Sequence, residues 1–203
     1  TAYQMQVKQV EDISFGFLAF GENGYGALNA DRKFGHAWVN ADGIDQYIRD
    51  CKQQVDVLIV QVHAGVELLD VPIPEWRDRY KAIIDAGADV LVAHHPHVVQ
   101  GIEEYQGKLI AYSLGNFYFD YPSNHPQWNK GGLLELNFEG KKLLNHQMHV
   151  VQKSGQQLDL LISAEVEPWL ASLQEKLQSE RYEDYVDRFA VNDWEKHHKA
   201  YYA

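Results

Sequence analysis

The chain has 203 residues, enough for one domain with a sizeable core, and its 45% of apolar residues is typical of a globular protein. It carries 29 acidic against 18 basic side chains, and the resulting net charge of -11 disfavours non-specific binding to nucleic acid or anionic lipid. The single cysteine, Cys51, excludes an intramolecular disulfide, and no apolar run approaches the roughly 18 residues that span a bilayer.

Residues 13–20, ISFGFLAF, form the first predicted element, a buried strand. A loop rich in Gly and Asn follows, and then a short helix to about Gln54, which we expect Asn40 or Asp42 to cap. The clearest strand is residues 55–62, VDVLIVQV. Such a continuous run of branched aliphatic residues is typical of a strand covered on both faces, as in a parallel sheet.

A second helix is predicted after the loop that holds Pro72 and Pro74, and it runs to about Ala86, with Gly87 as its stop. Residues 88–93, ADVLVA, then form another buried strand. A strand, a helix and a strand over this distance make a βαβ unit, so the strands at residues 55–62 and 88–93 should be parallel neighbours.

The following segments predict paired antiparallel strands. Residues 101–105 and 108–114 should form a hairpin, because the two residues between them are Gln106 and Gly107. Residues 133–138, LLELNF, alternate between apolar and polar, and a turn leads into a second alternating stretch over residues 143–151.

The end of the chain differs in composition, because helix formers and charged residues dominate from Pro168 onward. Two helices are predicted there, at residues 168–177 and 182–202. We assign residues 166–203 to a peripheral helical segment and residues 1–165 to the main domain.

Histidines follow both of the strong strands. His63 comes directly after residues 55–62, and His94, His95 and His97 come after residues 88–93. Ligands bind at the carboxyl ends of parallel strands, and neutral imidazole is the commonest protein ligand for transition metals. This pattern therefore favours a metal site over histidines that only form structural hydrogen bonds. The remaining histidines are predicted to be solvated: His36, His125, His146, His149, His197 and His198.

Four motifs in order over residues 55–120 resemble the bacterial capsule-synthesis family (CapA/PgsA-like, poly-γ-glutamate biosynthesis). They are His-x-Gly-x-Glu at residues 63–67, Asp-Ala-Gly-Ala-Asp at 85–89, His-Pro-His at 95–97 and Tyr-Ser-Leu-Gly-Asn-Phe at 112–117. The family belongs to the calcineurin-like metallophosphoesterases. The resemblance implies an α/β fold, a β-sandwich flanked by helices in four αββα layers.

The same resemblance implies a site for two divalent ions (Mn, Fe or Zn) in the complete protein, with His63, His95 and His97 among the metal ligands. The superfamily's earlier motifs, Asp-x-His, Gly-Asp and Gly-Asn-His, are absent from this sequence. Residues 1–165 are therefore expected to be the C-terminal half of a metallophosphoesterase-like domain, incomplete at its N-terminus, and the first residue, Thr1, is not an initiator Met.

An incomplete domain should leave apolar faces of residues 55–62 uncovered, which a soluble monomer does not tolerate. We therefore expect an upstream segment, or another chain, to complete the sheet. Alone, the chain should bind at most one divalent ion, and weakly.

Three further residues are candidates for the site. Glu67 is a candidate catalytic residue, as a general acid or an orienting carboxylate, with a solvent-facing loop position as the alternative. Ser113 and Asn116 are candidate substrate-binding residues, with hydrogen bonding inside their own turn as the alternative.

The leading hypothesis is a protein of capsule or poly-γ-glutamate type polymer biosynthesis with a metal-dependent hydrolase site, which acts on an anionic polymer or a phosphoester. One alternative is a metal-dependent hydrolase of another substrate, a phosphoester or a γ-glutamyl amide. Another is a non-catalytic scaffold of a polymer-export complex. The resemblance suggests the bacterial cell envelope, with a membrane anchor in a segment outside this chain.

Overall fold

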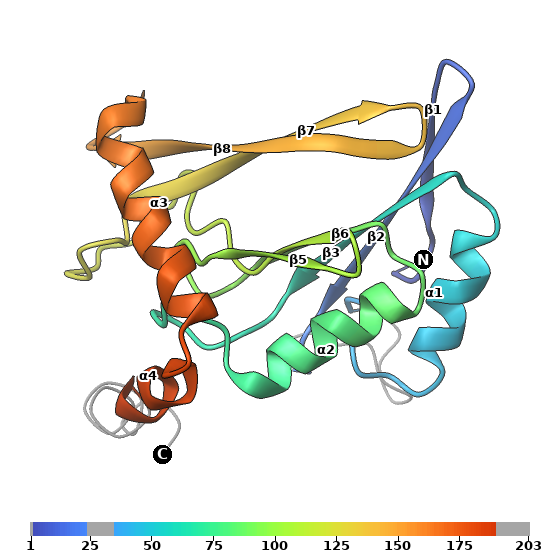
Figure 1. Ribbon diagram of the computed structural model, residues 1–203, viewed down its shortest axis with the longest axis horizontal. Coiled ribbons are helices and arrows are strands. Elements are labelled where there is room, and N and C mark those ends of the chain that lie inside the picture. Colours follow the sequence, from blue (N-terminus) through green and yellow to red (C-terminus); the bar gives the residue numbers. More distant parts are fainter. Residues whose placement is uncertain (1, 24–34, 190–203) are drawn as a thin grey trace.

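Two stacked β-sheets and four helices make up the computed structural model, which describes residues 2–23 and 35–189 (Figure 1). The larger sheet has the strand order β1-β2-β3-β4-β6-β5 and the smaller sheet the order β7-β8-β9. The strands of the larger sheet are β1 (Gln6–Val10), β2 (Ile13–Gly21), β3 (Val57–His63), β4 (Val90–His94), β5 (Ile102–Tyr105) and β6 (Lys108–Ala111). Those of the smaller sheet are β7 (Lys130–Glu139), β8 (Lys142–Ser154) and β9 (Gln157–Leu160).

The centre of the larger sheet is parallel. Strand β3 pairs in parallel with β2 on one side and with β4 on the other, and β4 pairs in parallel with β6. The antiparallel strands β1 and β5 form the two edges. The predicted βαβ unit, the hairpin of β5 with β6 and the antiparallel pairing of β7 with β8 are all confirmed. Strand β1 was not predicted, because every one of its residues is exposed and its sequence has no apolar pattern.

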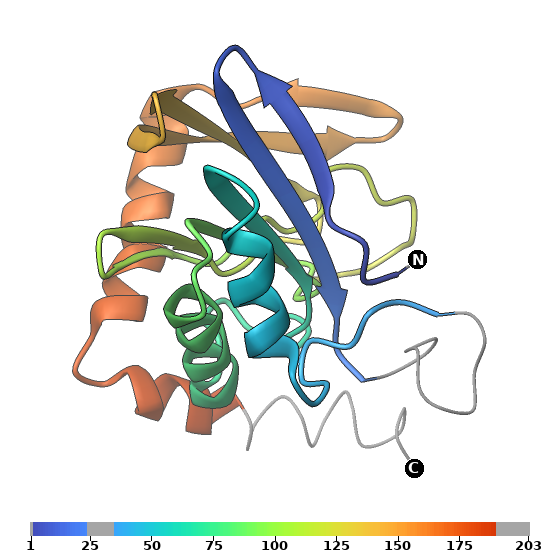
Figure 2. The same ribbon diagram turned by 90° about the vertical axis from the view of Figure 1, so that its right-hand side faces the viewer.

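Strand β3 is buried on both faces, which explains its continuous apolar run. Leu58, Val60 and Val62 pack into the core beneath the helices, and Val57 and Ile59 pack toward the smaller sheet. Helices α1 (Ile44–Lys52) and α2 (Pro74–Asp85) cover the first face (Figure 2). The expectation that the apolar faces of this strand would be uncovered is therefore wrong: elements of this same chain bury them.

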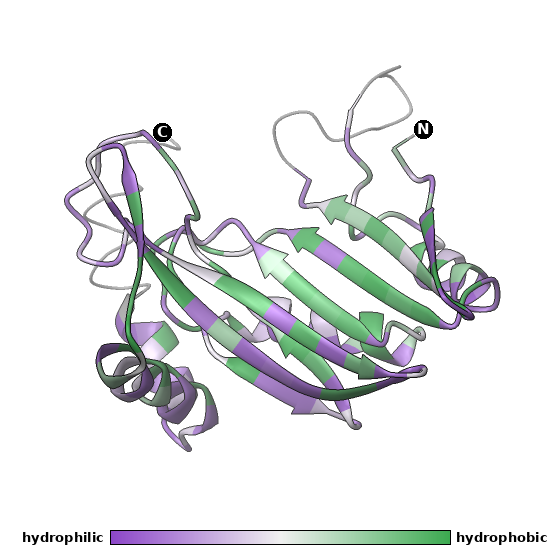
Figure 3. Ribbon diagram, turned by 90° about the horizontal axis from the view of Figure 1, so that it is seen from above, coloured by the Kyte–Doolittle hydropathy of each residue, from purple (hydrophilic) through white to green (hydrophobic). Residues whose placement is uncertain are grey.

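The smaller sheet buries one face and exposes the other. Leu134, Leu136 and Phe138 of β7 pack against the larger sheet, and the Phe138 ring lies edge-on to Phe15 at 5.3 Å. The outer face carries polar pairs such as Glu135 with His149 at 2.9 Å. Apolar and polar residues accordingly alternate along these strands (Figure 3). The mixed α/β sandwich is thus confirmed, while no helix within the described residues covers this outer face as a fourth layer.

Helix α3 (Ser163–Gln178) runs along one end of the two sheets and leads into α4 (Tyr182–Phe189) (Figure 1). It begins five residues before the predicted start at Pro168, because the Ile162 carbonyl already accepts the Glu165 and Val166 amides and Val166 is buried. The Gln174 side-chain oxygen accepts the Ile102 amide at 3.1 Å, which fastens α3 to the edge strand β5. The remainder of the predicted final helix lies outside the described residues. None of the described helices combines the length and apolar character that crossing a bilayer requires.

The cap of α1 also differs from the expectation. The helix starts after Gly43, at a φ of 77°, and neither Asn40 nor Asp42 caps it. A positive φ costs glycine little because it has no Cβ, so backbone geometry replaces the predicted side-chain cap.

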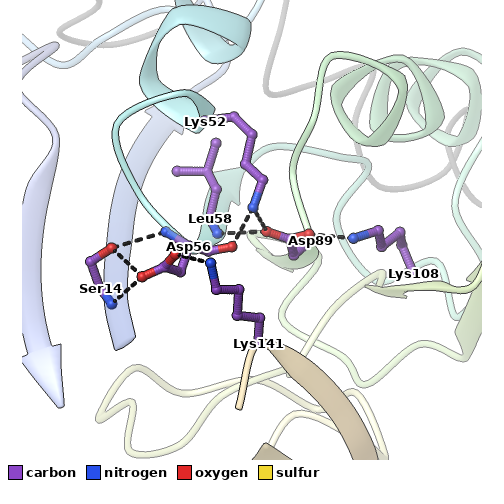
Figure 4. A network of polar contacts seen from close by, with 7 residues as sticks. All are labelled: Ser14, Lys52, Asp56, Leu58, Asp89, Lys108 and Lys141. Atoms are coloured by element: carbon purple, nitrogen blue, oxygen red, sulfur yellow. Dashed lines mark hydrogen bonds and ion pairs between the residues drawn. The ribbon is translucent and has the colours of Figure 1, made fainter. Parts of the chain in front are cut away.

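Carboxylates and lysines hold the amino ends of the parallel strands together (Figure 4). The Asp89 carboxylate accepts the Leu58 amide at 2.8 Å and Lys52 Nζ at 2.7 Å, and it also pairs with Lys108. Partial burial acts to raise the pKa of Asp89, but these hydrogen bonds outweigh it and lower the pKa below its ordinary value of 3.8. Asp89 therefore joins β3, β4 and β6 at one point.

Replacing Asp89 with Asn should lower the free energy of unfolding by about 1.5–3 kcal/mol, the usual contribution of hydrogen bonds to a charged group. The folded-state pKa lies below that of the unfolded chain, so the carboxylate stabilises the fold above pH 3.8 and loses this effect as the pH falls through the folded pKa. Urea unfolding at neutral and acidic pH measures the difference, with Asp187→Asn on the exposed surface of α4 as the control. If both variants lower the free energy of unfolding equally at neutral pH, Asp89 does not stabilise the strand ends in the way described.

Candidate functional site

The carboxyl ends of the four parallel strands meet at one edge of the larger sheet, called here the histidine edge. The strand register places Gly21 opposite His63 and His63 opposite His94, so β2, β3 and β4 end at the same level. The chain continues from these ends into Glu22 after β2 and into His95 and His97 after β4. The residues that follow these parallel strands therefore lie at one edge of the sheet, as the sequence analysis predicts.

His63 and His95 face each other. Nε2 of His63 lies 3.3 Å from Nδ1 of His95, and their ring centroids are 5.1 Å apart. Two nitrogens bound to one tetrahedral ion at about 2.0–2.1 Å lie about 3.3–3.4 Å from each other. The pair therefore fits two adjacent ligand positions of a single divalent ion.

Glu22 lies on the far side of the His95 ring. Its Oε1 is 3.4 Å from His95 Nε2, and its Oε2 accepts the Gly65 amide at 3.3 Å. Carboxylates commonly orient metal-binding histidines through the nitrogen that does not touch the metal, and Glu22 occupies that position. The sequence reasoning missed this residue, although it directly follows the strand predicted at residues 13–20.

His36 and His94 also differ from their sequence interpretation. His36 was predicted to be solvated, but it is partly buried and its Nε2 lies 2.9 Å from the Glu22 carbonyl oxygen. His94 was left out of the predicted ligand set; it is partly buried beside His63 in the register of β3 and β4. His197 and His198 lie outside the described residues.

His63 and His95 favour their neutral form because the pKa of each is lowered. Burial lowers the pKa of His63, and the neighbouring His95 and His97 lower it further. Burial likewise lowers the pKa of His95, with Glu67 opposing that change. Burial raises the pKa of Glu22, the Gly65 amide opposes this, and Glu67 adds to it. Neutral imidazoles have the free lone pair that a metal or a proton requires.

His97 is oriented by Asn116. The Asn116 side-chain Nδ2 donates to the Trp128 carbonyl at 2.9 Å, so its Oδ1 is the atom that faces His97 Nδ1 at 2.7 Å. An amide oxygen only accepts, so Nδ1 of the neutral ring must carry the proton and Nε2 keeps the free lone pair. Asn116 is buried, at 8% exposure, and in this geometry it serves His97 directly.

Backbone strain marks the same segment. His95 has a φ of 103° and His97 a φ of 60°, on either side of Pro96. Such conformations cost about 1–3 kcal/mol each for residues other than glycine, and they concentrate at functional sites. The turn that holds Asn116 is equally constrained, because a Cβ on Gly131 would lie 2.3 Å from the Asn116 backbone oxygen. Strand β7 is thereby packed directly against the site.

The three predicted ligands share the edge but do not converge on one point. The His97 ring lies 6.0 Å from that of His95 and stacks on Phe119 at 5.1 Å, with Trp128 at 4.9 Å. Within residues 2–23 and 35–189, no three His, Cys, Asp or Glu side chains come close enough to hold an ion. The three imidazoles therefore do not meet at one point in this structure, and among the described residues the pair of His63 and His95 is the one with ligand spacing. The assignment of all three as metal ligands stays a prediction.

Glu67 lies near the histidine edge, whereas the Ser113 side chain lies inside its own turn. Glu67 lies partly buried in the loop after β3, where its charge acts on His95 and Glu22. Ser113 is fully buried, and its Oγ accepts the Gly115 amide at 3.2 Å. The geometry therefore assigns the Ser113 hydroxyl to its turn, the alternative considered from the sequence.

Comparisons with known proteins agree with the motifs. Residues 1–121 match the sequence profile of the family described as "Bacterial capsule synthesis protein PGA_cap". The chain is 48% identical over 73 residues to the PGA biosynthesis protein CapA of Bacillus subtilis (strain 168), a match that covers 36% of this chain and 19% of that protein. It is 38% identical over 99 residues to the capsule biosynthesis protein CapA of Bacillus anthracis, covering 47% of this chain and 24% of that one. The chain thus matches less than a quarter of the length of either relative.

One solved structure with a similar arrangement is the sulfate thiohydrolase SoxB of Thermus thermophilus. The match has a TM-score of 0.48 and 10% identity, and it covers 83% of this chain and 28% of that protein.

The tautomer of His97 gives a direct test of the site geometry. For the neutral ring of His97 in the metal-free protein, we expect ¹⁵N NMR to show a protonated Nδ1 and an unprotonated Nε2, because Asn116 Oδ1 can only accept. Asn116→Leu removes the acceptor and should abolish this preference, whereas Asn116→Asp, which keeps an acceptor, should keep Nδ1 protonated and should also favour the imidazolium form. A neutral wild-type His97 that carries its single proton on Nε2 contradicts the orientation.

Proposed function

Because the chain belongs to the bacterial capsule synthesis protein family, we propose that it takes part in the biosynthesis of a capsule polymer of the poly-γ-glutamate type. We further propose that the histidine edge is part of a divalent-metal-dependent hydrolase site. The observation that supports the second proposal most strongly is the 3.3 Å spacing of His63 Nε2 and His95 Nδ1 at the carboxyl ends of neighbouring parallel strands.

His63 and His95 are the residues that would hold an ion of Mn, Fe or Zn. When bound, a divalent ion of this kind polarises a phosphoryl or carbonyl oxygen and lowers the pKa of its water. Glu22 would hold the His95 ring in place through Nε2, at the 3.4 Å separation described above. The lowered pKa of each imidazole keeps the lone pairs available at neutral pH.

His97 has a related role in this proposal. Its Nε2 lone pair is left free by the Asn116 contact to Nδ1, so the ring can accept a proton or serve as a further ligand. Glu67 remains the candidate general acid or orienting carboxylate. Asn116 then contributes by fixing His97, and contact between Asn116 and a substrate stays a prediction.

The described residues do not by themselves provide the ligands for two ions. Two dications need carboxylates that bridge and neutralise them, and neutral imidazoles alone do not provide that charge. The described residues supply the imidazole pair and Glu22. We therefore propose that an upstream segment or another chain contributes the remaining ligands.

Two other functions remain as alternatives. The same residues would suit a metal-dependent hydrolase of a phosphoester or a γ-glutamyl amide unrelated to a capsule. A scaffold of a polymer-export complex would need no catalysis at all. The two Bacillus relatives described above are capsule biosynthesis proteins, which favours the first proposal and a place in the cell envelope, with a membrane anchor outside this chain as a further proposal.

Metal binding tests the site itself. We expect calorimetric titration of the 203-residue chain with Zn²⁺ or Mn²⁺ to show at most one weakly bound ion per chain, because among the described residues the imidazoles with ligand spacing are those of His63 and His95. His63→Ala should abolish this binding, whereas His146→Ala on the exposed surface of β8 should leave it unchanged. Two tight sites in the wild-type chain would show that its own ligand set is complete.

Activity distinguishes the three functions. With Mn²⁺ added, a hydrolase should cleave either phosphodiesters or γ-glutamyl peptides. The rate should rise when an upstream segment that supplies the remaining ligands is present. His63→Ala should reduce the rate by at least about 10²-fold if an ion supplies the chemistry. Polymer output that is unchanged by His63→Ala in the producing cell would instead support the scaffold.

A further inference from the structure

An open cavity of about 610 Å³, called here the flank cavity, lies between the two sheets at one side of the sandwich. In the orientation of Figure 1, β8 lies above it, the hairpin of β5 with β6 below it, and α3 beside it. Cavities that bind small organic ligands usually measure about 300–1,000 Å³, so the flank cavity has room for a ligand of that kind. His63, His95 and His97 are not among the residues that line it.

The third strand of the smaller sheet stops before it reaches this cavity. Within the described residues, β9 pairs with β8 at residues 151–154, and the chain then leaves the sheet to begin α3 at Ser163. The cavity is lined by residues 146–148 of β8, where His146 and Met148 lie opposite Leu136 and Leu134 of the inner face. The space between the two sheets is therefore open at this side.

Direct packing on β5 and on the residue before it holds α3 beside the cavity. The Gln174 side-chain oxygen accepts the Ile102 amide at 3.1 Å. A Cβ on Gly101 would lie 2.9 Å from Leu177 Cδ2 and 3.3 Å from the Leu173 carbonyl oxygen, so the helix sits as close as glycine allows. A preformed site loses less entropy on binding than a flexible one, and these contacts preform the wall that α3 provides.

Buried apolar side chains form the floor of the cavity. Leu109, Val166 and Leu173 all line it and are all buried. Buried Gln100 also lines it, but its side-chain amide already donates to the Leu69 carbonyl at 2.7 Å. Partly buried apolar side chains continue the walls: Ile102, Met148 and Leu170. An apolar group placed on this floor leaves water, which favours binding.

The exposed rim of the cavity is acidic. Glu104 on β5 and Glu167 on α3 belong to two different walls, and both are exposed. Within the described part of the chain, neither carboxylate pairs with a cation, and no lysine or arginine lines the cavity. His146, exposed on β8, is the other titratable side chain of the lining. The two carboxylates favour a cation and repel an anion, so charge selects among the ligands that fit.

We propose that the flank cavity binds a small organic cation, with its ammonium group toward Glu104 and Glu167 and its apolar body on the floor. This site goes beyond the function proposed above, because β8 and α3 lie outside residues 1–121, which match the capsule synthesis family. It requires no metal ion. The same carboxylates disfavour an anionic polymer at this cavity.

Three probes that share a phenyl ring and differ in charge test the proposal: phenethylamine, 2-phenylethanol and phenylacetate. An ion pair at an exposed position changes an affinity by up to about fivefold, and two carboxylates act together here. At neutral pH, phenethylamine should bind at least about threefold more tightly than 2-phenylethanol, and phenylacetate should bind most weakly. Dissociation constants come from ¹H–¹⁵N NMR titration of the 203-residue chain with a chelator present. The amides that shift should lie within residues 102–104, 146–148 and 166–174.

Charge-removing variants locate the ammonium group. Glu104→Gln and Glu167→Gln keep the side-chain shape, and each should lower the preference for phenethylamine by about twofold or more without changing the affinity for 2-phenylethanol. Glu175→Gln, also exposed on α3 but outside the lining, is the matched control. Ala171 lines the cavity, so Ala171→Phe should fill part of it and weaken both probes. Circular dichroism checks that each variant is folded.

Equal affinities for the three probes, or tightest binding of phenylacetate, would overturn the proposal. An equal effect of Glu175→Gln and Glu104→Gln would show that the net charge of -11, rather than this cavity, attracts the amine. Absence of binding, amide shifts confined to other parts of the chain, or full affinity in Ala171→Phe would show that the cavity does not take this ligand. A failure of metal binding at the histidine edge would leave all of these expectations unchanged.

Discussion

Parallel pairing of β2, β3, β4 and β6 is the constraint on which the site depends. Each of these strands must enter the sheet at the same end and leave it at the other, so the residues that follow them meet at one edge. Burial of β3 on both faces fixes its register, because a shift by one residue would exchange the side chains that face the helices with those that face the smaller sheet. The opposition of His63 and His94 is a consequence of that register.

The two ends of these strands use polar groups in different ways. At the amino ends, Asp56 and Asp89 are paired with lysines and with backbone amides, so their charges stabilise the sheet (Figure 4). At the carboxyl ends, His63 and His95 face each other with pKa values lowered chiefly by burial. Ion-paired carboxylates are typical of residues that stabilise a fold, whereas neutral imidazoles held close together are typical of a binding site.

The smaller sheet does more than cover a core. Its first strand approaches Asn116 so closely that only glycine fits at position 131, and Asn116 in turn orients His97. Trp128, just before β7, accepts a hydrogen bond from Asn116 Nδ2 through its carbonyl, and its ring packs on Phe119. The histidine edge therefore depends on the short connection between the two sheets.

The sequence by itself determined the central parallel strands and the edge at which the histidines gather, but not the exposed strand β1. Residues 55–62 and 88–93 were predictable as parallel strands because burial on both faces demands continuous apolar residues, and the rule of strand ends then placed His63 and His95 at one edge. Tertiary structure alone decided which nitrogens meet, that His97 turns toward Asn116, and that Glu22 and His36 join the edge. These outcomes depend on side-chain directions set by positive φ values and by packing between distant segments, and neither is encoded in local periodicity.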